Sequence, residues 1–105
     1  MIEKVIRNGE VAVLYSPGYG AGWYSWNTDH PEILFHPKLV GMVEQGKQGE
    51  IDSEWISNNI GIKGVYTGGA EDLKITWLPV GTHFDVDEYD GSESIKTFDD
   101  IKLIA

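Results

Sequence analysis

The chain contains no cysteine among its 105 residues. This absence excludes disulfides, thiolate metal ligands and a cysteine nucleophile, and it fits a protein of a reducing compartment. The sequence also lacks an apolar run long enough to span a bilayer. Residues 1–7 have no apolar stretch of the secretion-signal type. We therefore expect a soluble protein of the cytoplasm with no membrane contact.

Basic residues are scarce, with 8 Lys and Arg against 17 Asp and Glu and a net charge of −9. The negative electrostatic field of such a chain repels nucleic-acid phosphates, so we expect no direct nucleic-acid binding. Solubility is the simple explanation of the charge. The alternative is an acidic inhibitor or DNA mimic that offers clustered carboxylates to a basic host protein. Its candidate residues are Asp85, Asp87, Glu88, Asp90, Glu93, Asp99 and Asp100.

Length and a hydrophobic content of 41% predict one globular domain over residues 1–105. Asn8-Gly9 joins two β-type runs and predicts a hairpin. The second run, 10–16, is largely apolar on both faces, which is typical of a central strand. Pro37 predicts the start of a helix that ends at Gly46.

A second short helix is predicted from Asp52 or Ser53 to Gly61. In the second half of the chain, apolar and polar residues alternate over 73–78 and 83–89, which predicts two strands. Residues 94–98 and 101–104 are expected to form two further strands. Asp90-Gly91 marks another tight turn. The predicted fold class is α+β, a bent antiparallel sheet of about five to seven strands with two helices on one face.

The segment 16–27 combines three glycines with four aromatic residues and almost no charge. Glycines let a backbone approach a ligand closely, and Tyr and Trp provide flat contact area. The segment is not a dinucleotide fingerprint, because Trp23 stands where that motif needs glycine. Two interpretations stay open: Trp23 and Trp26 pack into the core from one helical turn, or the segment lines a pocket.

For the pocket interpretation, aromatic rings would stack on a nucleobase, glycines would give close backbone contact, and polar groups would read the ligand. The segment 67–70 is either a plain connection or a second wall facing the first loop. A phosphate-bearing ligand would need Arg7, Lys38 or Lys63 to offset the negative field. The candidate ligand-binding residues are Gly18, Tyr19, Gly20, Gly22, Trp23, Tyr24, Trp26, Asn27, Thr67, Gly68 and Gly69.

Strand alternation would place His83, Asp85 and Asp87 on one face, as a metal or acid–base set of a small hydrolase would require. A solvated strand face explains the same pattern more simply. We therefore assign no catalytic residue, no metal ligand and no cofactor, and we favour a non-enzymatic protein.

The tracts 15–24 and 66–70 resemble those of small, acidic, cysteine-free proteins encoded by bacteriophages and prophages. The resemblance implies a role against host defence in the cytoplasm of a bacterial host, either by sequestering a nucleotide-derived immune signal or by mimicking DNA or blocking a host protein. It also implies a homo-oligomer with pockets near subunit interfaces. Aromatic content and the apolar tail 101–105 favour a two-fold dimer as well. The leading hypothesis is a protein that binds a small nucleotide-like molecule.

Overall fold

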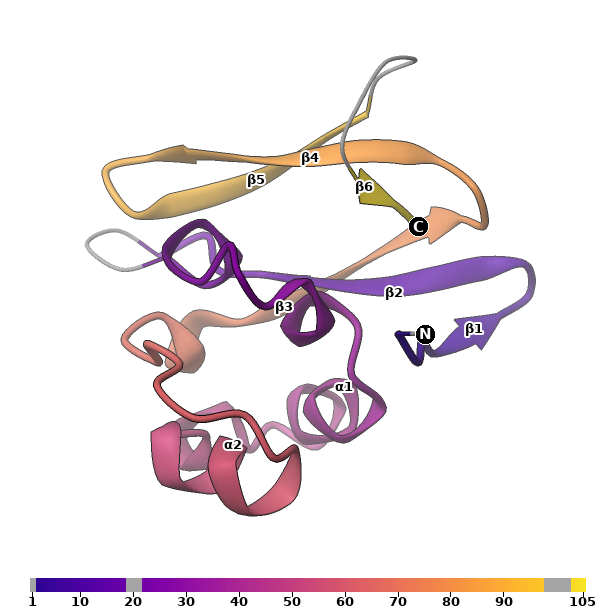
Figure 1. Cartoon of the computed structure of the whole chain (residues 1–105). Coiled ribbons are helices and arrows are strands. Elements are labelled where there is room, and N and C mark those ends of the chain that lie inside the picture. Colours follow the sequence, from indigo (N-terminus) through magenta and orange to yellow (C-terminus); the bar gives the residue numbers. More distant parts are fainter. Residues whose placement is uncertain (1, 19–21, 98–102) are drawn as a thin grey trace.

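The computed structural model describes residues 2–18, 22–97 and 103–105. Two α-helices and six strands within them form an α+β fold, which confirms the predicted class (Figure 1). The strands form two antiparallel three-stranded sheets, β1–β2–β3 and β5–β4–β6. The chain passes between the sheets from β3 to β4 through a turn at Gly81, which has a φ of 86°. This turn divides the expected strands between two sheets.

The opening hairpin joins β1 (Ile6–Arg7) to β2 (Glu10–Tyr15). Asn8 and Gly9 have φ values of 53° and 77°, the positive values that a type I′ turn requires at both central positions. Asn-Gly is the residue pair that tolerates them best, so the predicted hairpin is confirmed.

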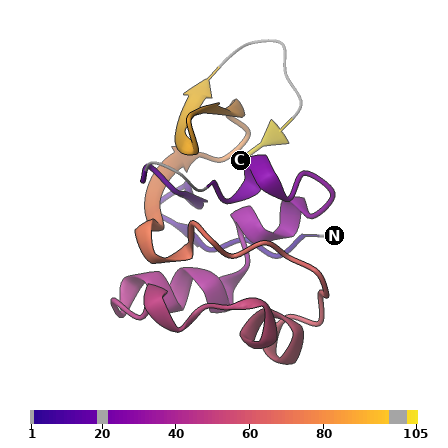
Figure 2. The same ribbon diagram turned by 90° about the vertical axis from the view of Figure 1, so that its left-hand side faces the viewer.

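Strand β2 is the centre of its sheet and is buried on both faces from Val11 to Leu14. Ala12 and Leu14 belong to a core cluster that includes residues of both helices. Val11 and Val13 belong to a second cluster that includes Phe84 of the other sheet. The sheet β1–β2–β3 therefore lies between the helices and the second sheet, as two perpendicular views show (Figures 1 and 2).

Both helices begin at residues that cap them. Helix α1 (Pro37–Glu44) follows His36, whose Nδ1 accepts the backbone N–H of Lys38 at 3.1 Å. Helix α2 (Ser53–Asn59) follows Asp52, whose carboxylate accepts the N–H of Trp55 at 2.7 Å. Both predicted helices are confirmed. Among the described residues, no helix is long and apolar enough to cross a membrane.

The second sheet consists of β4 (His83–Tyr89), β5 (Ser92–Thr97) and β6 (Leu103–Ile104), while β3 (Lys74–Pro79) is an edge of the first. Strand β6 pairs with β4 within the same chain. Ala105, which follows β6, is buried and exchanges backbone hydrogen bonds with Gly81 and Thr82. The described part of the tail is therefore paired along one edge within the chain, while Ile104 stays 50% exposed on the outer strand of the sheet.

Candidate functional site

The glycine-aromatic segment is held in place by one buried carboxylate, that of Glu93 on β5. This side chain is 2% exposed and accepts hydrogen bonds from the backbone N–H groups of Ser16, Trp23 and Ser25 at 2.8–2.9 Å. It also accepts the Ser25 hydroxyl at 2.7 Å, and its own backbone N–H donates to the Ser16 carbonyl at 2.8 Å. Glu93 thus joins the end of β2 to the residues beyond the undescribed positions 19–21.

Sequence reasoning placed Glu93 on an acidic surface, and that placement was wrong. A signal for the interior was present, because strand alternation puts Glu93 on the same face as Ile95, which packs against the core. The backbone N–H groups of Trp23 and Ser25 lie in the segment from which the pocket interpretation expects backbone contact with a ligand. They are already occupied by an anion of the chain itself.

The segment 66–70 lies directly against this first segment. The Asn27 side chain donates to the carbonyls of Trp23 and Tyr66 at 2.8 and 2.9 Å and accepts the Tyr66 N–H at 2.8 Å. The Ser16 hydroxyl donates to the Gly69 carbonyl at 2.8 Å. The two segments are therefore neighbours, and both the Nδ2 and the Oδ1 of Asn27 are engaged in holding them together.

The two tryptophans at the start of this region have opposite environments. Trp23 is fully buried and its indole N–H donates to the Ile33 carbonyl at 3.0 Å. It belongs to the core, so its assignment as a stacking residue was wrong. Trp26 ends the 3-10 helix η1 (Tyr24–Trp26) and is 57% exposed. Only the Trp23 ring faces the core, so the two rings lie in different environments although they are three residues apart.

Trp26 forms an exposed aromatic pair with Tyr66, which is 46% exposed. The ring centroids are 5.6 Å apart and the planes are tilted by 41°. Each ring lies across a glycine: a Cβ at Gly22 would overlap the Trp26 indole, and a Cβ at Gly68 would overlap the Tyr66 ring. These glycines therefore make room for the chain's own aromatic rings, where the sequence predicted contact with a ligand.

The remaining predicted residues have different environments. Thr67 and Tyr24 are half-buried, and Gly69 is buried against Gly22, so it offers no surface. Burial, and secondarily the charge of Asp85, raise the pKa of Tyr24 above 10.0, so its hydroxyl stays protonated at neutral pH. Tyr19 and Gly20 lie outside the described residues.

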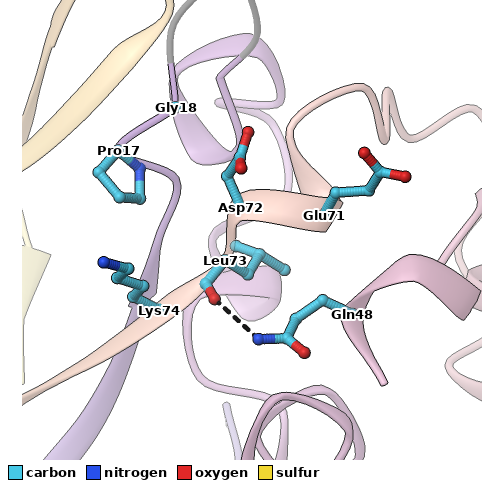
Figure 3. A pocket seen from close by; sticks show the side chains of 7 residues that line it. All are labelled: Pro17, Gly18, Gln48, Glu71, Asp72, Leu73 and Lys74. Atoms are coloured by element: carbon cyan, nitrogen blue, oxygen red, sulfur yellow. Dashed lines mark hydrogen bonds between the residues drawn. The ribbon is translucent and has the colours of Figure 1, made fainter. Parts of the chain in front are cut away.

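A pocket of about 450 Å³ lies where Pro17 and Gly18 meet residues 71–74 and Gln48 (Figure 3). It is lined by Pro17, Gly18, Gln48, Glu71, Asp72, Leu73 and Lys74. The Asp72 side chain points toward Gly18, whose missing side chain provides the space that it occupies. Of the predicted ligand-binding residues that the structure describes, only Gly18 lines this pocket.

Two of the three cations named as partners of a phosphate, Arg7 and Lys38, are engaged elsewhere. Arg7 forms an ion pair with Glu44 on α1 and lies over the ring of Trp77. Lys38 donates to the carbonyl of Asn59. Lys74, which the sequence analysis did not select, is the lysine that lines the pocket beside Gly18.

The alternative chemistries receive little support from the geometry. Asp87 pairs with Lys96 at 3.0 Å across the hairpin, and Asp85 accepts the N–H of Val86. In the parts of the chain that the structure describes, no group of three or more His, Asp or Glu residues is arranged to hold a metal ion. Lys96 and the buried Glu93 also interrupt the acidic stretch that a DNA mimic would present.

No protein-family model, curated protein or solved structure gives a significant match to this chain. The function is therefore inferred from the geometry of segments 16–27 and 66–70 and of the pocket.

Proposed function

We propose that this protein is a non-enzymatic binder of a small planar molecule of the nucleobase type, which stacks on Trp26 and Tyr66. The observation that carries the proposal is the exposed aromatic pair itself, with ring centroids 5.6 Å apart on two loops that are far apart in the sequence. Exposed aromatic rings at close spacing are a stacking platform for bases.

The scaffold beneath the pair supports this proposal. Asn27 fixes Tyr66 relative to Trp23, and Glu93 fixes the backbone of Ser25, next to Trp26. A platform held by buried hydrogen bonds loses little further conformational entropy when a ligand binds. The rings are therefore positioned before the ligand arrives.

Charge determines which part of the ligand would provide the affinity. Stacking contributes about 1–3 kcal/mol per base and does not depend on net charge. Phosphates, in contrast, would approach a chain of net charge −9 whose loop N–H groups are occupied by Glu93. We propose that recognition rests on the base, with affinity for a nucleoside at least equal to that for its phosphates.

The resemblance to phage-encoded defence antagonists provides a biological context for this activity. A stoichiometric binder of a base-containing molecule would act by sequestering a nucleotide-derived immune signal in the host cytoplasm. A host protein as a direct partner is the competing proposal, and it requires an acidic face that Lys96 and the burial of Glu93 interrupt.

Calorimetric titration with nucleobases, nucleosides, mononucleotides and cyclic dinucleotides tests the proposal. We expect binding by at least one member, and about tenfold weaker binding in Trp26→Ala, a loss that corresponds to about 1.4 kcal/mol. Val80→Ala is the matched control, because Val80 is 56% exposed and hydrogen-bonds Gly9 beside the β1–β2 turn. Absence of binding across the panel by folded protein, or equal affinities of Trp26→Ala and Val80→Ala, would overturn it.

A further inference from the structure

We propose that the pocket lined by Gly18, Gln48, Glu71, Asp72 and Lys74 is a second binding site, which takes a small zwitterion of the amino-acid type. Its volume of about 450 Å³ lies within the range of small-molecule sites, about 300–1,000 Å³. Most of its lining side chains are polar, with Leu73 and Pro17 as the apolar members. A polar solute therefore fits it better than an apolar ring.

The pocket presents charges of both signs that do not neutralise one another. Lys74 forms no salt bridge with Glu71 or Asp72 among the described residues, although all three line one pocket. Figure 3 shows Lys74 and Pro17 on one side, Glu71 and Gln48 on the other, and Asp72 with Leu73 between them. Separated opposite charges complement a ligand that carries an ammonium and a carboxylate a few atoms apart.

The hydrogen-bonding groups define the ligand more closely. Gln48 donates its Nε2 to the Leu73 carbonyl at 3.2 Å, which leaves its Oε1 as an acceptor. Together with the carboxylates of Glu71 and Asp72, the Gln48 Oε1 offers several acceptors to an ammonium group of the ligand. The Lys74 ammonium is the donor that the pocket offers to a carboxylate of the ligand. The acceptor excess and the net charge of −9 place the ammonium end at Asp72 and Glu71.

The backbone beside the pocket is also adapted to it. Any side chain at position 18 would overlap the Asp72 carboxylate. Glycine at this position therefore lets Asp72 lie against the backbone at the pocket wall, as Figure 3 shows. The pocket shares none of its lining residues with the Trp26–Tyr66 pair, so the two proposals stand independently.

The experiment is an NMR titration of the ¹⁵N-labelled chain with glycine, L-glutamine, L-aspartate and L-lysine. Putrescine supplies ammonium groups alone and acetate a carboxylate alone. We expect saturable shifts of the amides of residues 18 and 71–74 with at least one amino acid, and weaker binding of both single-charge probes.

Asp72→Asn and Lys74→Met should each weaken binding about tenfold, since each removes one charge-assisted contact. Glu54→Gln and Lys63→Met are charge-matched controls, and Trp26→Ala should bind as the wild type does.

No saturable shift with any amino acid would overturn the proposal. Tighter binding of putrescine than of every amino acid, with Lys74→Met unaffected, would equally overturn it, because the pocket would then be a simple cation site. Binding lost in Trp26→Ala but retained in Asp72→Asn would also contradict it, since the amino acid would then be bound at the aromatic pair.

Discussion

Asn27 and Tyr66 form a reciprocal pair in which one side-chain amide satisfies both backbone groups of the other residue. The Asn27 Nδ2 donates to the Tyr66 carbonyl at 2.9 Å, and the Asn27 Oδ1 accepts the Tyr66 N–H at 2.8 Å. This pair joins segments 39 positions apart and holds the exposed Tyr66 ring 5.6 Å from that of Trp26. The aromatic surface is thus defined by a buried polar contact beneath it.

Asn27→Asp tests this contact. The carboxylate would still accept the Tyr66 N–H, but it would face the carbonyls of Trp23 and Tyr66 without a donor. We expect a loss of about 2–3 kcal/mol in the free energy of unfolding, measured by urea denaturation. The same substitution at Asn59, whose amide donates to the Trp55 carbonyl at an exposed site, should cost less than about 1 kcal/mol. Equal losses at the two positions would contradict a special role of Asn27.

Glu93→Gln addresses the other buried group that holds the loop. A glutamine would bring its NH₂ toward N–H groups that now donate to a carboxylate, so at least one hydrogen bond would be replaced by a donor–donor conflict. Hydrogen bonds to charged groups contribute about 1.5–3 kcal/mol, and we expect a loss of about 3 kcal/mol in stability.

The control for this variant lies in the same hairpin. Glu88 is exposed and accepts the Gly91 N–H at 2.6 Å, so Glu88→Gln should change stability by less than about 1 kcal/mol. Amide exchange at Trp23 and Ser25 should accelerate in Glu93→Gln and stay unchanged in Glu88→Gln. Unchanged exchange in both variants would show that Glu93 does not hold the segment.

Local signals explain why much of the fold could be predicted from the sequence. Asn8-Gly9, Asp90-Gly91, Pro37 and Asp52 each act within about four residues, and the turns and helix starts that they predict are present. The apolar residues on both faces of segment 10–16 likewise identified β2 as a central strand.

The site could not be predicted in the same way, because its decisive contacts are distant in sequence. Glu93 meets Ser16 across 77 positions, and its place on the same strand face as Ile95 gave only an indirect sign that this carboxylate is buried. Trp23 and Trp26 have the same side chain and are three residues apart. Which of them is buried depends on how the 3-10 turn η1 packs against the rest of the chain.

His36 makes stability depend on pH. Burial, mainly, lowers the pKa of His36 below 6.5, assisted by Lys38 and opposed by Glu3 and Glu32. Its neutral Nδ1 caps α1, so the folded state binds fewer protons than the unfolded state as the pH falls below about 6.5. This contribution to stability is present above pH 6.5 and is lost as the pH falls through the folded pKa.

His36→Asn is the variant that separates the cap from the charge. Asparagine is a good N-cap residue and does not titrate, so helix α1 should be retained and the pH dependence of stability below about 6.5 should be reduced. Urea denaturation at several pH values measures both effects. A pH profile identical to that of the wild type would show that His36 does not contribute to it.

The last prediction concerns assembly. Among the described residues of the tail, β6 pairs with β4 and Ala105 is buried, whereas Ile104 is 50% exposed, so an interface could use either Ile104 or another apolar surface. Trp26 and Tyr66 form such a surface, and aromatic residues are enriched at interface centres. We expect a two-fold dimer at micromolar concentration by sedimentation velocity, converted to monomer by Trp26→Asp because a charge at the centre would be desolvated. A stacked base and the second copy would use the same two rings, so a saturating ligand should also shift the dimer toward monomer. Ile104→Asp, at the 50% exposed tail residue, should remain dimeric. A monomer mass for the wild type would exclude the dimer, and dissociation by Ile104→Asp alone would place the interface at the tail.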